Sequence, residues 1–176
     1  LLSGEFENSL SLPFKDLDLF NSVLLYIYKA FGNEGITKLA KACGVFLHPA
    51  QMVKSNKNKS NAAAVHIAPY FFSKMLQKDS PVKVVWPEDG AIVAPIFMLV
   101  KKETAALTQP FTDFFLSEKT GTVFAQSGFF PSTNAQVNNN LSDDKKFLWV
   151  GWDFIRSHDI GKLLNTLRND FEKQAE

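Results

Sequence analysis

Two residues with side chains suited to binding a small molecule lie in or directly after the apolar run over residues 61–68. His66 lies near the end of this run, and Tyr70 comes directly after Pro69. An imidazole can exchange a proton near neutral pH or ligate a metal, and a phenol hydroxyl both donates and accepts hydrogen bonds. Each residue also fits a packing role, His66 as a hydrogen-bonded core histidine and Tyr70 as a core aromatic. The segment is a candidate site for a polar solute.

The pattern around these residues predicts where such a solute would lie. An apolar run followed by Pro69 indicates a strand and then a helix to about Gln77, because proline suits the first helical turn. In open α/β sheets, ligands bind beyond the carboxyl ends of strands, where helix N-termini attract anions. We therefore expect an anionic or metal-associated solute against Tyr70, with His66 and Trp86 close by.

A second candidate group is the turn Pro87–Gly90, which carries Glu88 and Asp89 and directly follows Trp86. The two carboxylates could face a cationic solute such as a polyamine, or simply accept hydrogen bonds from turn amides. Trp86 could stack on a ligand or pack against neighbouring segments. These alternatives stay open at the level of the sequence.

Catalysis and several partner classes find no support in the motifs. The chain contains no Gly-x-Ser-x-Gly, Gly-x-x-x-x-Gly-Lys or His-Glu-x-x-His motif. Cys43 is the only cysteine, which excludes an internal disulfide and a cysteine-based zinc cluster. The 19 Lys and Arg residues balance the 18 Asp and Glu residues, so long-range attraction to a nucleic acid is weak. We expect no enzymatic activity, no cofactor and no nucleic-acid partner.

Helices are predicted wherever apolar residues recur at spacings of three and four. Glycines end the first two of these stripes, and Cys43 lies on the second. The last stripe follows Ser157 and Asp159, either of which suits a helix N-cap. The predicted helices cover residues 17–31, ended by Gly32, then 33–43, ended by Gly44, and finally 159–173.

Strands are predicted wherever β-branched residues are dense, over residues 62–68, 82–86 and 91–101. His48 is expected to end a further buried strand and to have a structural role. Pro110 is expected to open another helix whose phenylalanines, Phe111, Phe114 and Phe115, point inward. Polar residues over 54–61 and 132–146 predict surface loops. Because helices and strands alternate, the fold class is α/β.

Three motifs in this order resemble the late segment of a type II solute-binding protein of an ABC importer, over about residues 60–155. They are the turn Pro87-Glu88-Asp89-Gly90, the helix residues Phe111, Asp113, Phe114, Phe115 and Ser117, and the turn Gly128, Phe129, Phe130 and Pro131. The chain is similar to ferric-ion-binding members, which have two adjacent tyrosines where this chain has Tyr70-Phe71. Phe71 supplies no phenolate oxygen, so direct binding of iron by a pair of tyrosines is not expected. The identity of any bound metal is left open by the sequence.

The resemblance implies a type II periplasmic-binding-protein-like fold of two lobes. Residues 1–81 would form a second-lobe α/β segment, and residues 82–176 would form crossing strands and a returning segment of the first lobe. The opening strands of that first lobe are expected to be missing, which would leave apolar surface exposed and favour oligomer formation.

The resemblance also implies a function, which is capture of a small-molecule or ion ligand and its delivery to an ABC permease in the membrane. Such a protein would be periplasmic or extracellular, held by a lipid anchor outside this chain. One alternative is the ligand-sensing effector domain of a transcription regulator, which needs a helix-turn-helix. The other is an enzyme on the same scaffold, which needs a nucleophile or an acid/base pair.

Overall fold

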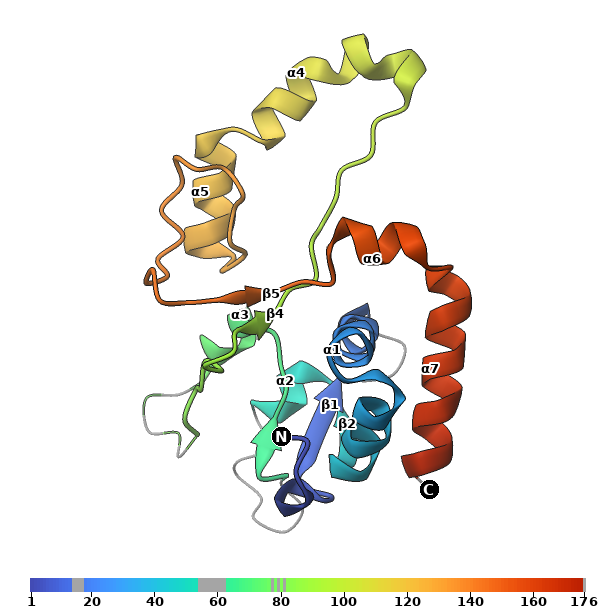
Figure 1. Cartoon of the computed structure of the whole chain (residues 1–176). Helices are drawn as coiled ribbons and strands as arrows, with labels where there is room; N and C mark the ends of the chain where they lie inside the picture. The colour runs from blue at the N-terminus through green and yellow to red at the C-terminus, as the bar shows by residue number, and fades with distance from the viewer. Residues whose placement is uncertain (14–17, 54–62, 77, 79, 81, 176) are drawn as a thin grey trace. The chain divides into compact units, whose positions relative to one another are not determined.

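The computed structural model describes residues 1–13, 18–53, 63–76, 78, 80 and 82–175, which form two compact units. The first unit comprises Leu1–Ala94 and Lys146–Glu176, and the second comprises Pro95–Lys145 (Figure 1). Leu17, Gln77 and the loop predicted over 54–61 lie outside the described residues. The fold is mixed α/β, as predicted.

A parallel sheet of three strands organises the first unit. The middle strand β1 (Leu10–Pro13) lies between β2 (Cys43–Leu47) and β3 (Val65–His66), which gives the order β2-β1-β3. Ser11 is paired with Val45 on one side and with His66 on the other. Strand β1 is not predicted by the sequence pattern, and the prediction that Cys43 belongs to a helix is wrong, because Cys43 is the first residue of β2. The pairing with β1 decides this assignment, which the local helical spacing could not show.

Helix α1 (Asp18–Ala42) connects β1 to β2 and contains the helix break that the sequence predicts. Gly32 has φ +61° and ψ −157°, so the helix is interrupted there and resumes toward β2. Glycine adopts this positive φ without the steric cost that a Cβ atom imposes. The two predicted helices are therefore confirmed, as two segments of one element.

Helix α7 (Ile160–Ala175) packs beside α1 and completes the core of the first unit (Figure 1). Its predicted N-cap is confirmed for Asp159, whose Oδ1 accepts a hydrogen bond from the Lys162 amide at 3.1 Å. Phe171 and Phe20 meet edge to face with ring centroids 5.3 Å apart. The fully or nearly fully buried apolar residues include Leu10, Leu12, Phe20, Leu24, Ile36, Leu39, Leu167 and Phe171.

Short helices complete the first unit: η1 (Gly4–Phe6), α2 (Pro49–Met52), α3 (Tyr70–Ser73) and α6 (Gly151–Ser157). The helix predicted from Pro69 to Gln77 is thus only four residues long, with Pro69 as its N-cap. The Ser73 hydroxyl donates to the Tyr70 carbonyl at 2.6 Å, and Lys74 N bonds Phe71 O in the tighter i,i+3 pattern. These bonds compete with continuation of the α-helix.

A second, two-stranded parallel sheet pairs β4 (Ala91–Ile92) with β5 (Phe147–Leu148). The strand predicted over 91–101 is therefore right only at its start, and residues 82–86 form no strand. High β-propensity does not make a strand without a partner, since the ladder supplies the hydrogen bonds. The β5 partner is only two residues long, and the described part of the chain pairs no other strand with β4.

The second unit contains η3 (Lys102–Thr104), α4 (Ala105–Phe115), α5 (Glu118–Ser127) and the predicted loop that follows. Pro110 lies inside α4, so the prediction that it opens the helix is wrong. The prediction that the α4 phenylalanines point inward is also wrong, since Phe111 is 61% and Phe114 is 59% exposed. Within this unit the buried residues are Gly121 and Ala125 of α5 and Val137 of the loop, and Gly121 faces the side chains of Ser132 and Val137.

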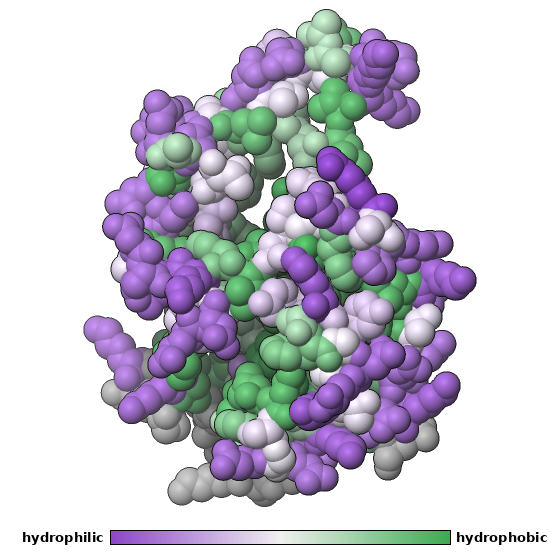
Figure 2. All heavy atoms as spheres, viewed as in Figure 1, coloured by the Kyte–Doolittle hydropathy of each residue, from purple (hydrophilic) through white to green (hydrophobic). Residues whose placement is uncertain are grey.

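Apolar residues accordingly reach the surface among hydrophilic ones, as the face in Figure 2 shows. Those of the second unit include Ile96, Phe97, Leu99, Leu107, Phe111, Phe114 and Leu116. No helix in the described part of the chain is long and apolar enough to cross a membrane.

Candidate functional site

Three aromatic rings of the first unit, Tyr70, Trp86 and Phe147, form what we call the aromatic cluster. Trp86 is the middle ring, and its centroid lies 5.6 Å from Tyr70 and 5.6 Å from Phe147. The interplanar angles are 74° and 84°, so both contacts are edge to face. Aromatic pairs favour this geometry because the positive ring edge meets a negative ring face. The structure thus brings together two of the predicted site residues, Tyr70 and Trp86.

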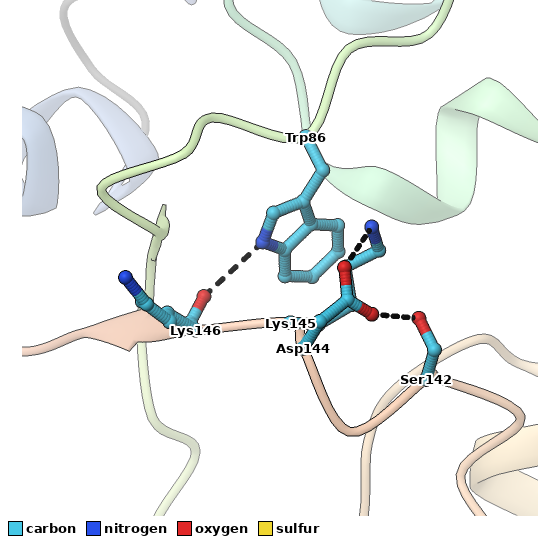
Figure 3. Close-up of polar contacts among 5 residues, drawn as sticks. All are labelled: Trp86, Ser142, Asp144, Lys145 and Lys146. Atoms are coloured by element: carbon cyan, nitrogen blue, oxygen red, sulfur yellow. Dashed lines mark hydrogen bonds and ion pairs between the residues drawn. The ribbon is translucent and has the colours of Figure 1, made fainter.

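Trp86 is held in this orientation by a hydrogen bond to the β5 end of the second sheet. Its indole Nε1–H donates to the Lys146 carbonyl at 3.2 Å (Figure 3). The same carbonyl accepts a bond from the Ala91 amide at 3.0 Å, which is part of the β4–β5 ladder. The Lys146 carbonyl therefore anchors both Trp86 and strand β4.

Gly90 makes this close approach possible. Its φ is +125°, and a Cβ atom there would lie 3.0 Å from both the Lys146 carbonyl oxygen and Leu148 Cγ. The preceding turn is closed by the Gly90 amide, which donates to the Pro87 carbonyl at 3.0 Å. A side chain at this position would combine backbone strain with steric overlap.

His66 lies at the carboxyl end of β3, beside the middle strand. Its Nδ1 lies 2.5 Å from the Ser11 hydroxyl. Partial burial lowers the pKa of His66, because desolvation disfavours the charged imidazolium. His66 is therefore neutral at pH 7.

The strand order makes the carboxyl end of this sheet a candidate position for a ligand. In β2-β1-β3, the chain goes from β1 to one side and then crosses to the other, so the topology switches between β1 and β3. Open α/β sheets bind ligands outside the carboxyl ends of their strands at such a point. Tyr70 begins the helix that follows β3, four residues after His66, which places both residues at this end.

The other predicted residues lie on the surface of the first unit. Glu88 and Asp89 are exposed on the turn after Trp86. Within the described residues, no hydrogen bond or ring contact links His66 directly to the aromatic cluster, and no group of three or more His, Cys, Asp and Glu side chains is arranged to hold a metal.

Three residues near the site were missed by sequence analysis. Ser11 was missed because β1 was not predicted, although a serine between two leucines in the run Leu10–Pro13 is the alternation of a half-polar strand. Phe147 opens an aromatic and apolar run that resembles a strand. Lys74 places its ammonium 5.0 Å from the centroid of the Tyr70 ring, a cation–π contact set by the short helix α3.

Two further polar groups have structural roles. His48 caps α2, with its Nδ1 accepting from the Ala50 amide at 3.1 Å, which agrees with the structural role predicted for it. In the second unit, Asp144 accepts bonds from the Ser142 hydroxyl and the Lys145 ammonium (Figure 3). The Ser142 bond, with Lys145 second, lowers the pKa of Asp144.

Comparison with known proteins identifies the family. The model of the bacterial extracellular solute-binding protein family matches residues 1–158, so the chain belongs to that family. Comparison with curated proteins and with solved structures found no match. Membership implies a type II periplasmic-binding fold, solute binding in ABC-type transport, and a periplasmic or extracellular location. Such proteins are typically not enzymes.

Proposed function

We propose that the first unit captures a small polar solute at the carboxyl end of β1 and β3, and that the protein delivers it to an ABC permease. Tyr70 and Trp86 would contact the solute, with His66 close by. Glu88 and Asp89 would lie at the rim of the site. The family supports the transport role, and the residue assignment rests on the arrangement of these side chains.

The observation that supports the site best is the aromatic cluster. Tyr70 and Trp86 are only partly buried, so their rings retain surface for a ligand. Trp86 is held by the ring of Phe147 and by its hydrogen bond to the Lys146 carbonyl. A ligand that binds to rings already held in place pays little conformational entropy, which favours affinity.

The four-residue length of α3 changes the expected basis for binding. A helix this short aligns few peptide dipoles, so its N-terminus attracts an anion less than the predicted longer helix would. Specificity must then come from side chains. The hydroxyl of Tyr70 and the imidazole of His66 supply the polar contacts, and the rings supply apolar surface.

Calorimetric titration tests this assignment. The chain is titrated with inorganic phosphate, acetate, Fe(III), Zn²⁺ and spermidine, and the variants Tyr70→Phe and His66→Ala are then compared for whichever solute binds. Loss of one hydrogen bond should weaken binding about fivefold or more for each variant. Trp152→Phe, an exposed substitution on α6, is the matched control and should leave affinity unchanged. Equal affinity in all three variants would show that the site lies elsewhere.

A further inference from the structure

Ser11 is a fully buried polar residue in the middle of the sheet, with a relative exposure of 0%. Its backbone carbonyl accepts from the Ile67 amide at 3.0 Å, which is part of the β1–β3 ladder. This ladder pairs Ser11 with His66 and brings their side chains to the same side of the sheet. The contact between the Ser11 hydroxyl and His66 Nδ1 is therefore fixed by strand register.

The proton on the Ser11 hydroxyl determines the tautomer of His66. A buried hydroxyl that does not donate a hydrogen bond is costly, so this proton needs an acceptor. Among the residues that the structure describes, His66 Nδ1 is the acceptor within reach of Ser11 Oγ. If Nδ1 accepts, a neutral imidazole must carry its own proton on Nε2.

We propose that Ser11 is a positioning residue that holds His66 as an Nε2–H donor, and that the transported solute presents an oxygen acceptor, such as a carboxylate or phosphate oxygen, to this N–H. The inference rests on the proposed function and specifies the chemistry of its solute. Within the described part of the chain, His66 Nε2 has no hydrogen-bond partner, and the ring is only partly buried.

This arrangement disfavours the other solute classes. A metal ion needs the lone pair of a ring nitrogen, and here Ser11 occupies one nitrogen while the proton occupies the other. An ammonium group is itself a donor and gains nothing from an Nε2–H. An oxygen acceptor is the group that matches, and the lowered pKa of His66 keeps the imidazole neutral so that the geometry persists at pH 7.

The chain contains two further histidines that serve as internal references. His48 Nδ1 accepts from the Ala50 amide at 3.1 Å, so its neutral form also carries the proton on Nε2. His158 Nδ1 lies 2.9 Å from the Phe154 carbonyl, an acceptor, and 3.0 Å from the Ser157 hydroxyl, which itself donates to that carbonyl, so we expect His158 Nδ1 to carry the proton. His48 and His158 therefore provide reference ¹⁵N shifts for the two neutral tautomers in the same spectrum.

The first arm of the test is ¹⁵N NMR of histidine-labelled chain at pH 8.5 without added solute. Histidine signals are assigned with His48→Gln and His158→Gln variants. We expect the Nδ1 of His66 to show the unprotonated shift of His48, and Ser11→Ala to remove this bias, whereas Ser9→Ala, on the same segment, leaves it intact. A His66 signal with the protonated Nδ1 shift of His158 overturns the proposal, whatever solute binds.

The second arm measures affinity for phosphate, acetate, Zn²⁺ and spermidine. We expect an oxyanion to bind, with Ser11→Ala weaker by about fivefold and His66→Ala by about tenfold. The affinity of His66→Gln, which keeps an N–H donor, should stay within about threefold of that of the parent chain.

Binding of Zn²⁺ or spermidine alone, dependent on Tyr70, would overturn the inference but leave the proposed function standing. If neither these four probes nor Fe(III) binds in a manner that depends on Tyr70 or Trp86, the proposed function fails and the inference about the solute fails with it.

Discussion

Replacement of Trp86 separates the contribution of its hydrogen bond from that of its ring. Trp86→Phe removes the Nε1–H donor but keeps an aromatic ring between Tyr70 and Phe147. The Lys146 carbonyl is not left without a partner, because it still accepts from the Ala91 amide. The cost should therefore be that of one net hydrogen bond, about 1 kcal/mol.

Trp86→Ala should cost more, because it also removes both edge-to-face contacts. Each such pair is worth about 0.5–1.5 kcal/mol beyond the area it buries, and a half-buried indole adds roughly 1 kcal/mol more. The expected total is about 3–5 kcal/mol, measured as the loss in free energy of unfolding by urea. Trp152→Phe, at 46% exposure, should change it by less than about 0.5 kcal/mol. If Trp86→Phe destabilises as much as Trp86→Ala, the hydrogen bond dominates and the ring packing described above is wrong.

Three further predictions follow from particular residues. Gly90→Ala should lower the free energy of unfolding by about 2 kcal/mol or more, because φ is +125° and the new Cβ lies 3.0 Å from the Lys146 oxygen; an unchanged urea midpoint would contradict the turn geometry. His66 should make stability fall as the pH drops from about 6.5 toward its lowered folded-state pKa, because the unfolded chain binds more protons in this window. His66→Gln should flatten that dependence in pH-dependent urea unfolding, and an equal slope in both proteins would exclude His66 as its source. The exposed phenylalanines of α4 should make this 176-residue chain self-associate at high concentration, and Phe111→Ser with Phe114→Ser should reduce the effect; light scattering that shows a monomer at all concentrations would contradict this.

Local signals predicted the two segments of α1 and helix α7 well, whereas α3 is shorter than predicted and α2 and α6 were not predicted. The break at Gly32 and the Asp159 cap of α7 depend on residues within one helical turn, which a sequence pattern reports directly. The strands were harder, because each needs a partner that is distant in the chain. The β4–β5 ladder pairs Ala91 with Phe147, so the density of β-branched residues over 91–101 overestimated the strand.

In the candidate site, too, local features were predictable and contacts between distant segments were not. Tyr70, Trp86 and His66 were identified from their own segments, and the structure places Tyr70 against Trp86. The partner of His66 was not identified, because Ser11 is 55 residues away and meets it only through the register of β1 and β3. The inward orientation predicted for the α4 phenylalanines failed for a related reason, since periodicity identifies an apolar face but not what covers it.

The central claim, that the solute binds against the aromatic cluster, is tested most directly by fluorescence. In a chain with Trp149→Phe and Trp152→Phe, Trp86 is the remaining tryptophan, because the chain has three. Titration with the solute identified by calorimetry should change Trp86 emission in a saturable way, with the calorimetric affinity, and Tyr70→Ala should abolish both signals together. Calorimetric binding that leaves Trp86 emission unchanged, or that survives Tyr70→Ala, would contradict the account.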